Sequence, residues 1–260
     1  MFSTNKAKFG FKSILAALLF VASSIAHALP IYVLNDTSSS HTMVQSAIGD
    51  LNSLGHSVTT GGTLADYSAY SQVWDLRYNA NLGAADVTAM GSYLAGGGRM
   101  YMTGEHAGFN ASRNTSLVSW VNGVGGGNMI LADVFHAGLQ TFTAAGSAVG
   151  LDSAPNALAG LNTNAANSAV AASIDQGFLV TQEGNLTQGS VVGWDFGDIS
   201  GAAGSRMLLG FDIELFANGV NWTENMVAYL DSASAPEPGI LALMGMGLLG
   251  IGFSRRKKAA

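Results

Sequence analysis

Residues 93–110 read YLAGGGRMYMTGEHAGFN, and the order of elements within them is the strongest indication of the class of fold. Three consecutive glycines, 96–98, close a helical pattern that covers 84–94. A short β-rich run then covers 99–103, Gly104 ends it, and we expect a helix over 112–121. A helix that leads into a strand, which then passes through a glycine-rich turn into the next helix, is typical of a parallel α/β sheet.

The same alternation precedes this stretch. An apolar run at 31–34 predicts a buried strand, and apolar residues at helical spacing follow over 43–54, closed by Gly55. Ser38, Ser39 and Ser40 are candidates for the cap of that helix. Two further strands are predicted over 56–60 and 70–76. We therefore expect an α/β fold with a doubly wound, mostly parallel sheet.

Toward the C-terminus the pattern loosens. Residues 141–175 are rich in Ala, Ser, Asn and Gly, which predicts irregular structure or an insertion. Later strands are predicted over 178–181, 191–196 and 207–211, and a final helix over 222–230. The whole of 29–230 has a length that suits one domain.

The charges of the chain are unevenly distributed. Its net charge is −6, but seven of its 11 basic residues lie in the two ends, at 6–12 and 255–258. Of the 17 acidic residues, all but Glu237 lie between those ends and face only four arginines, so this part is near −12. Such a domain repels phosphate backbones, and we exclude nucleic acid as a partner.

The N-terminal end is typical of a secretory signal peptide over 1–28. A basic stretch at 6–12 is followed by an apolar run at 14–21 and by Ala26-His27-Ala28, a small-residue cleavage pattern. We expect signal peptidase to cut after Ala28.

The C-terminal end has three parts in a fixed order. Pro236-Glu237-Pro238 closes a small polar linker that begins at 231, a charge-free apolar segment covers 239–253, and a basic cluster covers 255–258. The apolar segment has 15 residues, short of the roughly 20 that span a bilayer as a helix. We expect a transmembrane helix with its basic tail over 239–258, inserted transiently and with the tail in the cytoplasm. An ordinary short membrane anchor is the alternative.

This order resembles the PEP-CTERM sorting signal of Gram-negative bacteria. The resemblance implies processing by an exosortase near Pro236, Glu237 and Pro238, and transfer to the cell envelope or the extracellular matrix. It also implies a secreted protein with exopolysaccharide or other matrix components as candidate partners.

A candidate site follows from the predicted sheet. Ligands of open α/β sheets bind beyond the carboxyl ends of the parallel strands. The polar residues that follow the predicted strands, or lie in the turns and helices after them, are the candidate ligand-binding residues: Asp36, His41, Asp75, Arg77, Asn110, Arg113, Asp212 and Glu214. Arg77 and Arg113 can each hold a carboxylate or phosphate through a planar guanidinium, or form a structural ion pair.

The run Gly104-Glu105-His106-Ala107-Gly108 is the most specific internal motif. A Gly-x-x-x-Gly run between a strand and a helix predicts a tight, strained nucleophile elbow that exposes its middle side chain. The alternative is a glycine-rich turn without chemistry. Glu105 and His106 are the candidate catalytic residues.

The middle of the chain resembles the class I glutamine amidotransferase-like superfamily, which has a flavodoxin-like fold. The resemblance rests on IYVLND at 31–36, VWDLR at 73–77, the stretch at 93–110 and NWTENMVAYL at 221–230. Enzymes of that family place Cys at the elbow, whereas this chain has His106 there and no Cys at all. Thiolate acyl transfer is excluded, because there is no Cys. The chain also has Asp212-Ile213-Glu214 where the family has a His-x-Glu pair.

Two functions follow from this departure. The first is a non-catalytic, Cys-less binding domain of an envelope or matrix protein. The second is an extracellular hydrolase that uses a His/carboxylate site at the strand ends. No metal-binding motif spacing occurs in the sequence, so we expect neither a metal ion nor a cofactor.

Overall fold

The computed structural model describes residues 28–184 and 187–232. The predicted signal peptide, the sorting segment and the apolar helix at 239–253 lie outside these residues. In the first half, strands and helices alternate: β1 (Pro30–Leu34), α2 (Thr42–Ser53), β2 (Ser57–Gly61), β3 (Gln72–Asp75), α3 (Ala84–Ala95), β4 (Arg99–Thr103) and α4 (Ala107–Gly123). The predicted strands and helices of this half are confirmed within a few residues, except that α4 begins five residues before the predicted start.

The central sheet has seven strands in the order β2-β1-β3-β4-β12-β11-β8. β12 (Arg206–Gly210) pairs in parallel with β4, so five neighbouring strands run in one direction. β11 (Val191–Trp194) is antiparallel to β12 and to β8 (Phe178–Leu179). The mostly parallel sheet of the sequence prediction is confirmed.

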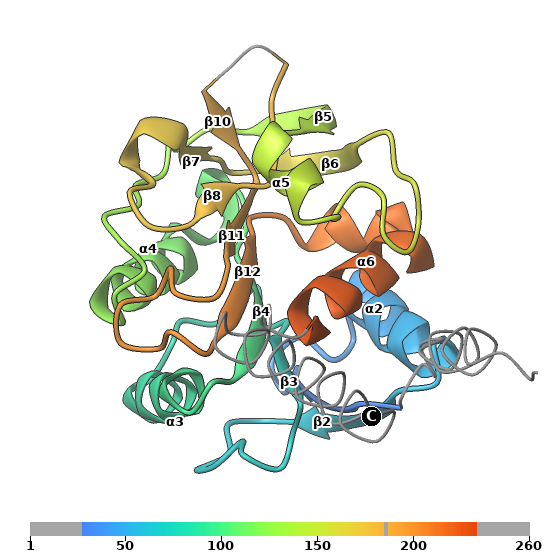
Figure 1. Ribbon diagram of the computed structural model, residues 1–260, viewed down its shortest axis with the longest axis vertical. Coiled ribbons are helices and arrows are strands. Elements are labelled where there is room, and N and C mark those ends of the chain that lie inside the picture. The colour runs from blue at the N-terminus through green and yellow to red at the C-terminus, as the bar shows by residue number, and fades with distance from the viewer. Residues whose placement is uncertain (1–27, 185–186, 233–260) are drawn as a thin grey trace, which may run out of the picture.

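Alternate residues of each strand pack on opposite faces of the sheet, as the pleat requires. Trp74 and Leu208 face α2 and α6 (Val220–Asp231), whereas Val73 and Met100 face α3 and α4. Figure 1 shows α3 and α4 on one side of the sheet and α2 and α6 on the other. The helices therefore leave the two ends of the parallel strands as the places where a site can form.

The stretch at 141–175 differs from the prediction of irregular structure. It holds α5 (Ala144–Ala148), β6 (Leu161–Ala166), β7 (Ala169–Val170) and the 3₁₀ helix η1 (Ala171–Ser173). β6 pairs with β5 (His136–Phe142), which also pairs with β9 (Thr181–Gln182), and β7 pairs with β10 (Gln188–Gly189). Small side chains hide the alternation that would have revealed these strands, and partners far along the chain hold them in place.

Two local predictions are wrong. The cap of α2 is His41, whose Nδ1 accepts a hydrogen bond from the Met43 N–H at 3.3 Å, and not one of the three serines before it. The turn after β4 is not strained, because His106 has φ −67° and ψ 155°, an ordinary extended conformation. Asp133 is the one non-glycine residue of the described chain with a positive φ.

Within the part of the chain that the structure describes, every helix is too short or too polar to cross a membrane.

Candidate functional site

The carboxyl ends of the parallel strands carry two groups of polar side chains. The first is an ionic cluster of Asp36, Asp75, Arg77, Asp86 and Arg113. The second lines a pocket of about 220 Å³ whose walls are His41, Tyr78, Glu105, His106, Phe109, Asn164, Ala165, Asp212, Ile213 and Glu214. The sheet thus brings together most of the residues that the sequence predicted, but it divides them between two places.

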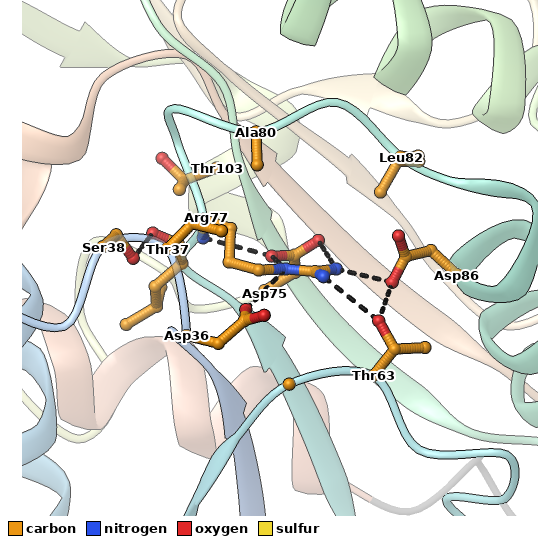
Figure 2. Close-up of polar contacts among 12 residues, drawn as sticks. Asp36, Thr37, Ser38, Thr63, Asp75, Arg77, Ala80, Leu82, Asp86 and Thr103 are labelled. Carbon is orange, nitrogen blue, oxygen red and sulfur yellow. Dashed lines mark hydrogen bonds and ion pairs between the residues drawn. The ribbon is translucent and has the colours of Figure 1, made fainter.

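In the ionic cluster, Arg77 lies between two carboxylates (Figure 2). Its Nε and one Nη donate to the two oxygens of Asp75 at 2.9 and 3.0 Å, and the same Nη reaches Asp86 at 2.8 Å. The other Nη donates to the Thr63 hydroxyl at 3.2 Å. Asp36 is peripheral, since its carboxylate is 3.9 Å from Arg77 Nε and 47% exposed.

Arg113 is the second arginine that pairs with Asp75 in the cluster. It is fully buried, lies 3.1 Å from Asp75, and donates to the carbonyl groups of Thr103 and Ala80. Burial alone would raise the pKa of Asp75, but the ion pairs with Arg113 and Arg77 hold that pKa below its usual range. The donors and acceptors of this cluster are used within the protein, which suits a structural role at the base of the site.

Glu105 is the central acid of the pocket. Glu105 lies two residues after the end of β4. Its backbone N–H donates to the side-chain amide oxygen of Asn114 at 2.9 Å, which fixes the backbone at this point. Burial and the nearby Asp212 raise the pKa of Glu105 to about 7, although the N–H groups of Ile213 and His106 favour its charged form. Near neutral pH this carboxyl group can therefore donate or accept a hydrogen bond.

Asp212 follows β12 and is itself buried. One of its oxygens accepts from the N–H groups of Asn164 and Ala165 at 2.8 and 3.2 Å, and the other accepts from the Glu214 N–H at 2.9 Å. Through these hydrogen bonds to Asn164 and Ala165, Asp212 holds β6 at the carboxyl edge of the central sheet. Glu214 is the more exposed carboxylate of the pocket.

Aromatic rings form the rest of the wall. The Tyr78 ring stacks on Phe109 with centroids 5.8 Å apart and meets His41 edge-on at 4.8 Å. Phe109 is 57% exposed, and the His106 ring lies 6.0 Å from it. His106 is the N-cap residue of α4, and its Nδ1 is buried without a hydrogen-bond partner among the described residues.

Asn110 lies outside the pocket wall. Its φ of −142° interrupts α4, and its side-chain oxygen accepts from the Arg113 N–H and from the Ser112 hydroxyl. It therefore caps the main part of the helix.

Tyr78 and Phe109 were not predicted as site residues, nor were Asn164 and Ala165. Tyr78 lies three residues beyond β3, so the rule that ligands bind at strand ends could have found it. Asn164 and Ala165 reach the pocket from β6, a strand without a sequence signal. Over 28–184 and 187–232, no group of three or more His, Asp or Glu side chains is placed to hold a metal ion.

The sorting signal at the C-terminal end matches a known family model. The PEP-CTERM protein-sorting motif matches residues 234–257. The motif indicates that exosortase processes the protein and that the protein is secreted or associated with the envelope of a Gram-negative bacterium. No curated protein matches the chain.

Solved structures resemble the described fold. The mmIFT52 N-terminal domain has a TM-score of 0.56 at 10% identity, over 80% of this chain and 100% of that one. A thua-like protein from Parabacteroides merdae has a TM-score of 0.47 at 9% identity, over 82% and 94%. A β-galactosidase from the haloarchaeon Halorubrum lacusprofundi has 0.49 at 13% identity, over 78% and 30%. The likeness to the mmIFT52 domain indicates a shared fold and no shared function. The likenesses to the other two structures are too weak to indicate a shared fold.

Proposed function

We propose that this chain is an exported component of the cell envelope or extracellular matrix and that its domain over 29–230 is a binding domain for saccharides. The proposal includes removal of a signal peptide after Ala28, a transient apolar helix at 239–253, and descent from amidotransferase-like proteins without the Cys nucleophile. The order of strands and helices supports that descent. The pocket at the carboxyl edge is the binding site.

The observation that carries the proposal is the composition of the pocket wall. Aromatic rings of Tyr78 and Phe109 offer flat apolar faces, and Glu105, Asp212 and Glu214 offer carboxyl groups beside them. A sugar ring has an apolar face of C–H groups and hydroxyl groups around its edge, so it can stack on the rings while its hydroxyls donate to the carboxylates. The wall contains no Lys or Arg, which disfavours anionic ligands.

The experiment measures binding of neutral oligosaccharides to the full chain by calorimetry. Phe109→Ala and Glu214→Gln should each weaken binding by about tenfold, since each removes one main contact. Ile130→Ala is the matched control for Phe109, because Ile130 is equally exposed, at 56%, and lies outside the pocket. The proposal fails if no oligosaccharide binds, or if Phe109→Ala binds as well as the control.

A hydrolase is the second candidate function, and the protonation of Glu105 favours it. A carboxylic acid with its pKa raised to about 7, beside the carboxylate of Asp212, is the arrangement of a general acid with an electrostatic partner. Asp212 is less suited to act as a base, because three backbone N–H groups already bond to its oxygens. Turnover of glycosides, esters or amides that Glu105→Gln and His106→Ala abolish would establish the hydrolase and replace the binding function.

A further inference from the structure

A second pocket lies at the opposite edge of the sheet. It has a volume of about 240 Å³ and is lined by Ala65, Asp66, Ser68, Tyr70, Ser71, Ala89, Ser92, Tyr93, Gly96, Gly97, Gly98 and Arg99. Tyr70 and Ser71 directly precede β3, and Arg99 begins β4. The pocket therefore lies at the amino ends of the strands and shares no residue with the carboxyl-edge pocket.

Arg99 differs from the other arginines of the domain. Arg77, Arg113 and Arg206 each lie within 4 Å of a carboxylate. Among the residues that the structure describes, Arg99 is the arginine without an ion pair, and its buried Nε has no hydrogen-bond partner. Its guanidinium carbon lies 5.9 Å from the centre of the Phe196 ring. In a domain with such an excess of acidic residues, a guanidinium beside a pocket and without a carboxylate partner can hold an anion.

The rest of the wall suits an oxyanion with several acceptor oxygens. Ser71 and Ser92 lie in it, and their hydroxyl groups are hydrogen-bond donors. Asp66 opposes a bound anion: its oxygens accept from the N–H and the hydroxyl of Ser68, both at 2.8 Å, and these hydrogen bonds lower its pKa. The carboxylate is therefore charged, and its removal should favour the anion.

The chain also enters and leaves the domain at this edge. β1 begins at Pro30, and the last described helix, α6, ends beside the amino end of β12, where Arg206 donates to the carbonyl groups of Tyr229 and Ser232. Arg206 and Arg99 are register partners on neighbouring strands. Ser232, the last described residue before the sorting motif at 234–257, thus lies at the same edge of the sheet as the pocket.

We propose that the amino-edge pocket, with Arg99 as its anchoring cation, binds a phosphate group. The group can come from free phosphate or from the headgroup of a phospholipid beside the departing chain. The site is independent of the saccharide pocket, so either can fail without the other.

The test titrates inorganic phosphate into the full chain in neutral detergent micelles and follows heat release. We expect saturable binding that Arg99→Gln weakens by at least about tenfold, the usual effect of losing a charged hydrogen-bond donor. Asp66→Asn keeps an acceptor for Ser68 and should tighten binding by a few-fold. Asp133→Asn is the matched control, since it removes an exposed charge outside the pocket.

The basic residues at 255–258 are present in every variant, so differences between variants report the pocket alone. Glycerol phosphate serves as the second probe: binding tighter than that of inorganic phosphate identifies a lipid headgroup as the source, and weaker binding identifies free phosphate. The proposal is overturned if the wild-type chain shows no saturable phosphate binding. It is also overturned if Arg99→Gln, with an unchanged circular dichroism spectrum, binds as tightly as the control.

Discussion

Burial determines how Glu105 responds to pH, and this response can be measured as stability. Its pKa rises from 4.5 to about 7 on folding. The folded protein therefore keeps a proton that the unfolded chain loses, and the free energy of unfolding falls as pH rises from about 4.5 to about 7. Above that window the loss is complete and amounts to roughly 3 kcal/mol.

Glu105→Gln should remove this dependence, because the amide is neutral and its oxygen can still accept from the Ile213 N–H. We expect equal stability of the variant and the wild type at pH 4, and a variant that is more stable by up to about 3 kcal/mol at pH 8. Urea denaturation at both pH values measures the difference. Two stability curves that run parallel with pH would contradict the assignment.

Asp75 is the residue that holds the ionic cluster together. Asp75→Asn leaves Arg77 and Arg113 buried without their shared carboxylate, which should cost about 3–5 kcal/mol of unfolding free energy. Asp36→Asn is the matched control: Asp36 is half-exposed, so its loss should cost less than about 1 kcal/mol. Denaturant titration of both variants checks this order, and equal costs would show that the cluster is not structural.

At the scale of elements, the turn from β4 into α4 positions both Glu105 and His106. Gly104 is required there by packing and not by backbone strain. A Cβ atom at Gly104 would lie 2.6 Å from Asn114 Oδ1 and 2.8 Å from Phe211 Cδ1. The same Asn114 holds the backbone of Glu105 through two hydrogen bonds.

Gly104→Ala should therefore destabilise the domain by about 1–3 kcal/mol and displace Glu105 from the pocket. Gly108→Ala is the control within the same motif, since its Cβ would meet only the His106 ring, at 3.2 Å, and it should cost less than about 1 kcal/mol. Thermal denaturation, together with the pH dependence described above, distinguishes the two. Equal destabilisation by the two substitutions would mean that the backbone freedom of glycine, and not the space around Gly104, is what the motif requires.

At the scale of the whole molecule, we expect the domain to fold without the sorting segment. Arg206 fixes the last turn of α6 through the carbonyl groups of Tyr229 and Ser232, and its Nε pairs with Asp195 at 2.6 Å. We expect a chain that covers 29–232 to unfold within about 2 °C of the full chain, measured by calorimetry. A chain that ends at Val227 lacks the buried Tyr229 and Leu230 and should unfold at a clearly lower temperature.

A chain that covers 1–232 keeps the predicted signal peptide and should lose exosortase processing, because it lacks the motif at 234–257. Mass spectrometry of the protein recovered from cells and medium gives both termini of each form. A shortened chain that is still sorted like the full one would contradict the role of the motif.

Elements that are defined by residues close together in the sequence were predicted well, and elements that depend on partners distant in the sequence were not. Hydrophobic periodicity over 31–121 predicted four strands of the sheet and two of its helices nearly in full, because those elements are bounded by local signals such as Gly55 and Gly96. β5 and β6 escaped prediction, because their alternation is weak and their register partners lie up to 41 residues away, as Thr141 and Gln182 do. The structure divides the polar residues at the strand ends between an ionic cluster and a pocket, and their spacing along the chain did not predict this division.

The sorting motif and the alternation of strands and helices were predictable from the amino-acid sequence, since both depend on patterns that are contiguous along the chain. The sequence also determined that no cysteine acts in the pocket. The three-dimensional fold was needed to show that Arg77 and Arg113 pair with Asp75, that Glu105 lies near Asp212, and that Arg99 has no carboxylate partner. Burial and through-space distance control which charges meet, and neither follows from spacing along the chain.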